Sequence, residues 1–396
     1  MKSRDSRLAQ FYPARKLGFL SSYELEVLRH VLEMGGFYNA HAHIDRAHTL
    51  DAKYLEHIGT TPLEASCFPL SVKQNLVGDL HIGPAYSEAN LRERMSWVIE
   101  QQIAYGVTRL DTNIDATPDL PEDGLMVVRI ALELKEKYAD KIKIRVAPTP
   151  IFGFREGTER FAVFKEASKS CDFLSGLPEK DDYSGAVDRK GKVGFRPALR
   201  RVLELGNELG KEVQFHLDQA NSPFETGTET LLEGLRWVDT PTHSDGRPMV
   251  WVVHMISPSA YDEDRFKRLA DALLEHNVGV IVCPSAAISM RQLRPIATPT
   301  HNSLARVMEL IKMKVPLRLG TDNICDVFVP QSEGDMLTEI KIGSHASRFA
   351  TPSIWAKLAT GTELNNVDIA TVGRVLHEDR KVYTSVAPAG WHPAVE

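Results

Sequence analysis

Two histidines separated by one residue, His41 and His43, are the side chains whose type and spacing most clearly predict chemistry in this sequence. They lie at the end of a short apolar run, Phe-Tyr-Asn-Ala-His-Ala-His-Ile-Asp, at residues 37–45. Because residues i and i+2 of a β-strand project to the same face, both imidazoles would present nitrogen to one place. Two such nitrogens provide half of a site for a divalent metal ion. For this pair alone, coincidence on a surface or in a core is the competing interpretation.

Three later strand-like runs also end in a candidate ligand or acid–base residue, namely His216, His254 and Asp322. Because candidate ligands recur at the ends of four strand-like runs, one shared metal site is favoured over coincidence. The predicted ligands of a mononuclear site are His41, His43, His216 and Asp322. Imidazole and carboxylate ligands suit Zn²⁺, with Fe²⁺ as the alternative. A water molecule bound to such an ion ionises near neutral pH and becomes a nucleophile.

Asp322 and His254 are predicted to handle protons beside this ion. Asp322 can contact the metal, take a proton from water and return it to a leaving nitrogen. His254 ends the strand that follows His216, and it suits a hydrogen-bond donor or proton carrier better than a fifth ligand. The competing interpretations are a helix N-cap for Asp322 and a satisfied core histidine for His254.

The elements that must position these residues alternate between strand and helix. Apolar runs predict strands at residues 37–40, 108–115, 143–148, 173–178, 212–216, 249–254, 278–283 and 316–322. Helical patterns occupy residues 25–34, 88–104, 126–138, 197–209, 263–276 and 303–314. This alternation favours an α/β fold, a parallel (β/α)₈ or TIM barrel, over a doubly wound sheet. In such a barrel the carboxyl ends of the strands form the active-site face, where the predicted ligands would meet.

The composition is that of an ordinary globular protein of 396 residues, with 43% hydrophobic and 25% charged residues and a net charge of -6. The acidic balance and the lack of a basic stripe argue against a nucleic-acid partner. No apolar run approaches the length of a membrane span, and the N-terminus does not resemble a signal peptide. The scattered cysteines are typical of reduced thiols. We therefore expect a cytoplasmic protein with a small-molecule substrate and no membrane contact, and leave a homo-oligomer open.

The ordered set of His-x-His, two further histidines and an aspartate resembles the amidohydrolase superfamily, and more narrowly the bacterial cytosine deaminases. The matching stretches are residues 41–45, 112–115, 176–178, 216–219, 287–291 and 320–323, followed by Asp326. They fall in consistent order between about residues 37 and 345. The resemblance implies hydrolysis of a non-peptide C–N bond by a metal-activated water, typically the deamination of a nitrogen heterocycle.

Gln219 departs from the pattern of that family. Cytosine and adenosine deaminases place a glutamate three residues after the strand-five histidine, and this glutamate protonates a ring nitrogen. A glutamine can donate a hydrogen bond but cannot deliver a proton at neutral pH. Asp218, Glu179 or Asp182 would have to replace that acid. Alternatively, the scissile bond lies next to a carbonyl, as in an amide, lactam or urea, which the metal and His254 can polarise.

Several polar residues near strand ends are candidate substrate contacts. They are Asn113, Glu179, Asp218, Gln219, Arg291 and Asn323. Each of them taken alone could instead cap a helix or stabilise a loop through a hydrogen bond. Hydrolysis of a phosphotriester or a lactone is a further alternative for the reaction. Because of Gln219, a metal-binding protein of reduced catalytic activity is another alternative.

The expected organisation is an N-terminal helical extension at residues 1–36, the barrel at residues 37–386 and a flexible tail at residues 387–396. Most relatives carry a small β-sandwich built from both termini. Both ends of this chain lack a clear series of strands, so we expect the sandwich to be absent. Residues 49–86 are expected to cover the barrel mouth, with a mobile loop at residues 78–84.

Overall fold

Parallel strands in two hydrogen-bonded sheets form the centre of the protein. The computed structural model describes residues 2–183, 191–238, 243–289 and 303–386. The strands are β1 (Phe37–Ala42), β2 (Val107–Asp115), β3 (Lys143–Thr149), β4 (Leu174–Gly176), β5 (Val213–Leu217), β6 (Val250–His254), β7 (Val278–Val282) and β8 (Leu317–Leu319). One sheet has the order β1-β2-β3 and the other the order β4-β5-β6-β7-β8. Every strand pairs in parallel with its neighbour in sequence within these sheets.

Backbone hydrogen bonds join the two sheets at both edges. On one side, the Asp322 N–H donates to the His41 carbonyl at 2.9 Å and the His43 N–H donates to the Asp322 carbonyl at 3.3 Å. On the other side, the Asp172 N–H donates to the Val146 carbonyl at 2.8 Å. The strand series therefore closes as a (β/α)₈ barrel, as the sequence predicts.

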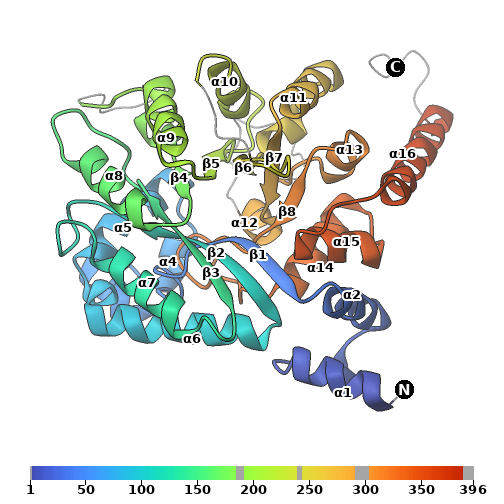
Figure 1. Ribbon diagram of the computed structural model, residues 1–396, viewed down its shortest axis with the longest axis horizontal. Helices are drawn as coiled ribbons and strands as arrows, with labels where there is room; N and C mark the ends of the chain where they lie inside the picture. Colours follow the sequence, from blue (N-terminus) through green and yellow to red (C-terminus); the bar gives the residue numbers. More distant parts are fainter. Residues whose placement is uncertain (1, 184–190, 239–242, 290–302, 387–396) are drawn as a thin grey trace.

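Helices surround the strands on the outside (Figure 1). Those between β1 and β5 are α3 (Ala52–Leu55), α4 (Pro62–Ser66), α5 (Leu70–His81), α6 (Glu88–Ala104), α7 (Met126–Lys137), α8 (Arg160–Ser170) and α9 (Phe195–Leu209). Those that follow are α10 (Gly227–Gly234), α11 (Glu263–Glu275), α12 (Pro284–Ser289), α13 (Val307–Lys312), α14 (Met336–Ser347), α15 (Pro352–Thr360) and α16 (Asn366–Val386). Parallel strands need such crossovers, and the helices bury the outer faces of the sheets.

The chain is also helical ahead of β1. Helices α1 (Lys2–Phe11) and α2 (Ser22–Glu33) precede the first strand. Helix α2 begins with a capping box, in which Ser21 accepts from the Glu24 N–H and Glu24 accepts from the Ser21 N–H. Within the described residues every strand belongs to the two barrel sheets, so this part of the chain contains no β-sandwich. None of the described helices has the length and apolar character needed to cross a bilayer.

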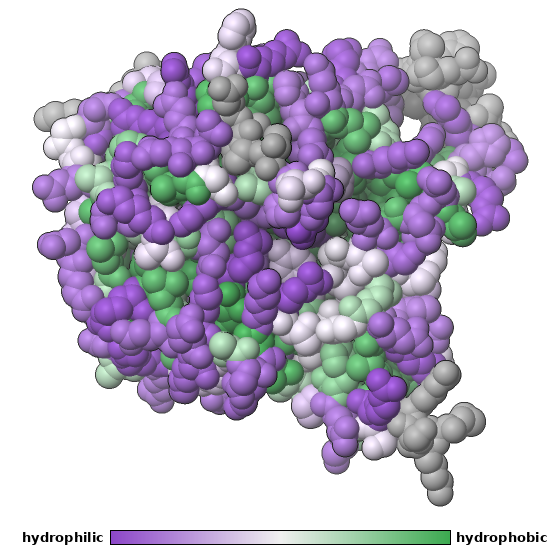
Figure 2. Space-filling model, in the orientation of Figure 1, coloured by the Kyte–Doolittle hydropathy of each residue, from purple (hydrophilic) through white to green (hydrophobic). Residues whose placement is uncertain are grey.

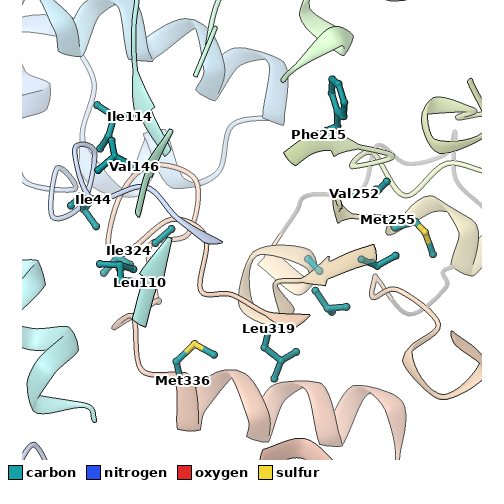
Figure 3. Packing of buried hydrophobic residues seen from close by; sticks show 14 of the residues in the cluster. Ile44, Leu110, Ile114, Val146, Phe215, Val252, Met255, Leu319, Ile324 and Met336 are labelled. Carbon is teal, nitrogen blue, oxygen red and sulfur yellow. The ribbon is translucent and has the colours of Figure 1, made fainter. Parts of the chain in front are cut away.

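The apolar core lies between the strands and the helices around them. Buried side chains from both sheets contribute to it, among them Leu110, Ile114 and Val146 of β2 and β3, and Phe215 and Val252 of β5 and β6 (Figure 3). Burial of this kind supplies most of the free energy that drives folding. Hydrophilic residues cover most of the surface seen in Figure 2, with small hydrophobic patches between them.

The predicted strands lie where the structure has β1 to β8, although β4 and β8 are shorter than predicted, whereas the predicted loop at residues 78–84 is wrong. Helix α5 continues to His81, and only the end of that segment leaves the helix. Its buried residues Val77 and Leu80 anchor it against the barrel, a tertiary contact that its glycine-flanked sequence does not reveal. Strand β8 is shorter than predicted and ends at Leu319, because Gly320 follows. A Cβ atom at Gly320 would lie 2.8 Å from the His41 carbonyl oxygen, so glycine allows the chain to pass close to β1.

Candidate metal centre

The predicted ligands meet at the carboxyl ends of the barrel strands, although they are far apart in the sequence. His41 lies in β1 and His43 just beyond it, His216 lies in β5, and Asp322 follows β8. All four side chains are nearly inaccessible to solvent. The alternation of β1 sends both histidines inward, as the His-x-His spacing predicts.

The imidazoles of His41, His43 and His216 offer nitrogens that all lie within 4.8 Å of one another. The closest pair is His41 Nε2 and His216 Nε2, at 3.1 Å. Asp322 Oδ1 lies 3.3 Å from His43 Nε2 and 3.7 Å from His41 Nε2. Lone pairs of neutral imidazoles that face one another repel, and a cation between them removes that repulsion. The donor set, three imidazoles and one carboxylate, therefore fits a divalent metal ion.

Partners on the far side of two imidazoles hold the rings in place. His41 Nδ1 lies 3.2 Å from Gln214 Oε1 and 3.0 Å from the Asn113 amide nitrogen. His216 Nδ1 lies 3.4 Å from the Gly176 carbonyl oxygen. A proton on Nδ1 that donates to such an oxygen leaves Nε2 unprotonated and facing the site, which is the form that binds metal. Asn113, a predicted substrate contact, thus lies behind a predicted ligand.

Burial sets the protonation states of these groups. Desolvation, with the neighbouring histidines, lowers the pKa of His41 to about 3 and lowers the pKa of His216 well below its usual value. Desolvation alone would raise the pKa of Asp322. The hydrogen bond from His43 and the fields of the nearby histidines outweigh it and hold that pKa below its usual range. Neutral imidazoles and an ionised carboxylate are the forms that metal ligation requires.

His254 ends β6 beside these ligands but outside the group of converging nitrogens. Its Nε2 lies 3.8 Å from Asp322 Oδ2, and burial lowers its pKa. Its Nδ1 is buried and has no hydrogen-bond partner among the described residues. His254 therefore lies next to Asp322, and its role as a proton carrier stays a prediction.

A pocket opens above the site. Its walls are His43, Arg46, Phe68, Leu70, Lys73, Gln74, Thr149, Ile151, Leu177, His216, Gln219, His254, Ala286, Ser289, Asp322, Asn323, Phe328 and Val329. Phe68, Leu70, Lys73 and Gln74, from α5 and the segment before it, form part of the wall, so this part of the stretch at residues 49–86 lies at the barrel mouth.

The predicted substrate contacts divide between the pocket wall and positions behind it. Gln219 and Asn323 line the pocket. Glu179 lies behind Gln219, and its carboxylate accepts from the Gln219 side-chain amide and from the Asp218 N–H, both at 2.9 Å. Asp218 faces α10, where its carboxylate accepts from the Gly227 N–H at 2.7 Å and from Thr228. Arg291 lies outside the described residues.

Several wall residues were not predicted from the sequence. Arg46 directly follows the segment at residues 41–45, and that adjacency is a signal that could have drawn attention to it. Lys73 and Phe328 belong to segments without strand-end character, and only the tertiary structure brings them to the pocket.

Comparisons with known proteins agree with this architecture. No protein-family model matches the chain. An uncharacterized protein of Haemophilus influenzae is 27% identical over 293 residues, which is 73% of this chain and 95% of that protein. A pterin deaminase of Rhizobium rhizogenes is 19% identical over 250 residues, or 63% of this chain, and the match spans 53% of that relative, about half its length.

Two solved structures show the likeness in three dimensions. A 5-methylcytosine deaminase of Klebsiella pneumoniae, liganded with 5-fluorocytosine, superimposes with a TM-score of 0.65 at 20% identity, covering 87% of this chain and 75% of that one. An N-isopropylammelide isopropylaminohydrolase of Burkholderia multivorans gives a TM-score of 0.60 at 16% identity, covering 86% of this chain and 74% of that one. The chain therefore shares the fold of these two structures, in agreement with the barrel predicted from the sequence.

Proposed function

We propose that this chain is a hydrolase that cleaves a non-peptide C–N bond of a small, cyclic nitrogenous molecule with the help of one divalent metal ion. His41, His43, His216 and Asp322 would hold the ion. The observation that carries the proposal is the convergence of three buried imidazoles and one carboxylate beneath a pocket at the carboxyl ends of the barrel strands. When bound, a divalent ion supplies a Lewis acid that makes a water molecule acidic near neutral pH.

Asp322 is the group proposed to accept the proton of the attacking water. Its pKa is held below the usual range, so it enters the reaction ionised. It also lines the pocket, where a substrate can reach it. After the attack, Asp322 returns the proton to the leaving nitrogen, which makes that nitrogen a better leaving group.

His254 is proposed to stabilise the charge that develops on the substrate. It lines the pocket and lies 3.8 Å from Asp322 Oδ2. An N–H in a site closed to solvent stabilises a developing oxyanion more strongly than water does. In this role His254 polarises the carbonyl or ring carbon that water attacks.

Gln219 favours a substrate whose scissile bond lies next to a carbonyl. One N–H of its side-chain amide donates to Glu179, which leaves its carbonyl oxygen free to accept an N–H from a substrate and its second N–H free to donate. Gln219 lines the pocket, whereas Glu179 contacts the Gln219 amide and is not one of the described lining residues. A lactam, amide or urea supplies an N–H for Gln219 and needs no acid at that point.

Ring deamination remains the second candidate, and one observation supports it. Burial, together with the charges of Glu225 and Asp218, raises the pKa of Glu179 well above its usual value. A protonated Glu179 next to Gln219 would be a source for the proton that deaminases of this fold deliver to a ring nitrogen. The proton would then have to pass around or through the Gln219 amide.

Metal analysis combined with a substrate panel tests the proposal. The purified protein would be analysed for bound metal and then assayed with pyrimidines, triazines, pterins, lactams and ureas. The proposal expects about one metal ion per chain and turnover of at least one member of the panel. Gln219→Glu separates the two candidates, because it should improve ring deamination and leave lactam or urea hydrolysis no better. A metal-free protein with no affinity for added zinc or iron would contradict the proposal.

The finer assignments also belong to this proposal. Zinc is proposed as the ion, with iron as the alternative, because imidazole and carboxylate ligands together with an exchangeable water are usual in catalytic zinc sites. We further propose a cytoplasmic enzyme, and size-exclusion chromatography with light scattering would show whether it forms a homo-oligomer.

A further inference from the structure

Lys73 is a buried cation in the wall of the proposed active site. It lies on α5, its exposed fraction is 5%, and it lines the same pocket as His43, His254 and Asp322. Its ammonium group donates to the Phe328 carbonyl oxygen at 3.3 Å. That contact is to a neutral acceptor and leaves the charge of Lys73 uncompensated.

No carboxylate forms an ion pair with Lys73 in the part of the chain that the structure describes. The nearby Asp326 is directed elsewhere, because it accepts from the Phe328 N–H at 2.9 Å, the Val329 N–H at 3.1 Å and the Asn323 amide. Asp326 acts on Lys73 only as a more distant charge. Burial outweighs it and lowers the pKa of Lys73.

Arg46, the other cation of the wall, is in a different position. Its guanidinium pairs with Asp115 at 3.3 Å and lies over the Phe328 ring at 5.4 Å from the ring centre. Its charge is therefore balanced within the protein. Among the described residues that line the pocket, Asp322 is the carboxylate, and it belongs to the metal centre, so these residues present one surplus positive charge at Lys73.

Burying an ammonium group without a counter-ion costs free energy, and a binding anion recovers much of that cost. We propose that Lys73 binds an acidic substituent of the substrate, and that the natural substrate is a nitrogen heterocycle that carries a carboxylate. This inference rests on the proposed function, because it assumes that the pocket above the metal centre holds the substrate. Apolar wall residues such as Phe68, Ile151 and Leu177 would cover the faces of the ring while its acidic group points to α5.

The test compares matched ligands that differ only in the acid. Cytosine with cytosine-5-carboxylate and pterin with pterin-6-carboxylate would be titrated calorimetrically into the zinc-loaded full-length protein. In at least one pair the carboxylate should bind about 10-fold or more tightly than its neutral partner. Lys73→Met should abolish that preference and leave the affinity for the neutral member unchanged. Lys73→Arg, which keeps the charge, should retain part of it.

Lys53→Met is the matched control, since Lys53 lies on α3 with 63% of its side chain exposed. It should leave the preference intact. Three results would overturn the proposed role of Lys73. The carboxylate and its neutral partner could bind equally in both pairs, none of the four ligands could bind, or the preference for the carboxylate could survive in Lys73→Met. Binding does not depend on turnover. A lysine-dependent preference without hydrolysis would thus refute the proposed function alone, and hydrolysis without the preference would refute only the role of Lys73.

Discussion

The two ends of the barrel hold buried polar side chains in opposite ways. At the amino ends of the strands, charges of opposite sign alternate. Arg145 lies 3.0 Å from Asp111 and 3.4 Å from Glu212, and the Tyr38 hydroxyl donates to Asp111 at 2.7 Å. At the carboxyl ends, groups of the same kind face one another, and two histidine nitrogens lie 3.1 Å apart.

The difference indicates which end serves the fold and which serves chemistry. The amino end satisfies its own charges with residues of the chain, so it can contribute to stability without a ligand. The carboxyl end gathers imidazole lone pairs around one point, and only a cation makes that arrangement favourable. Substitutions at the two ends should therefore have separable effects, one on unfolding and the other on metal binding and activity.

The largest effect is expected for Asp322→Asn at the carboxyl end. The amide keeps the shape of the side chain but can neither take the proton of water nor bind metal as a carboxylate. We expect kcat to fall by about 1,000-fold or more on any substrate that the panel identifies. Metal analysis and circular dichroism of the same sample would show a folded protein with reduced metal content. A variant that keeps wild-type kcat would remove Asp322 from the mechanism.

At the amino end, Arg145→Met should act on stability instead. It leaves Asp111 buried without its closest cation and leaves Glu212 only the longer ion pair with Arg318 at 3.6 Å, so the free energy of unfolding should fall by about 3 kcal/mol. Urea denaturation measures this loss, and metal content should stay unchanged. Asp271→Asn is the control, because it removes one partner of an exposed ion pair with Lys267 and should change stability by less than about 1 kcal/mol. If Arg145→Met abolished metal binding in folded protein, the two ends would not be independent.

Removal of the metal should destabilise the wild type, and this effect should depend on the ligands at the carboxyl ends of the strands and not on the charges at the amino ends. At a free metal concentration 100-fold above Kd, bound metal adds about 2.7 kcal/mol to the free energy of unfolding. Thermal denaturation with chelator, and again after zinc is restored, should show a reversible fall in Tm. The double variant His41→Asn/His216→Asn should show no such response, whereas Arg145→Met should respond as the wild type does.

The smallest expected effect is a pH dependence of the stability that is lost when Arg145, at the amino ends of the strands, is replaced. Burial outweighs the attraction of Arg145 and raises the pKa of Asp111 to about 6, against an ordinary value of 3.8. A raised folded-state pKa gives stability that is complete below pH 3.8 and is lost as the pH rises through the folded-state pKa. Without Arg145 this pKa rises further. Arg145→Met should therefore lose more stability relative to wild type at pH 8 than at pH 5, by roughly 1 kcal/mol. Urea midpoints measured at both pH values would test this, and a loss that is equal at both would contradict it.

Much of the fold could be predicted because its signals are local. The apolar runs at β5, β6 and β7 and the helical pattern of α6 follow from hydrophobic periodicity and flanking glycines, which short sequences contain. Helices α5, α8 and α10 were missed, since their stability comes from packing against the barrel and not from a strong local pattern. The closeness of β8 to β1 likewise depends on Gly320, whose importance appears only when His41 lies beside it.

The sequence by itself determined which chemistry this protein can carry, because residue type sets ligand character and alternation in a strand sets the direction of His41 and His43. Only the tertiary structure decided which groups surround that chemistry. It placed Glu179 behind Gln219 and Asp218 against α10, and brought Lys73 into the pocket wall. Contacts between residues so distant along the chain depend on how helices and loops pack on the barrel, and no local pattern encodes that packing.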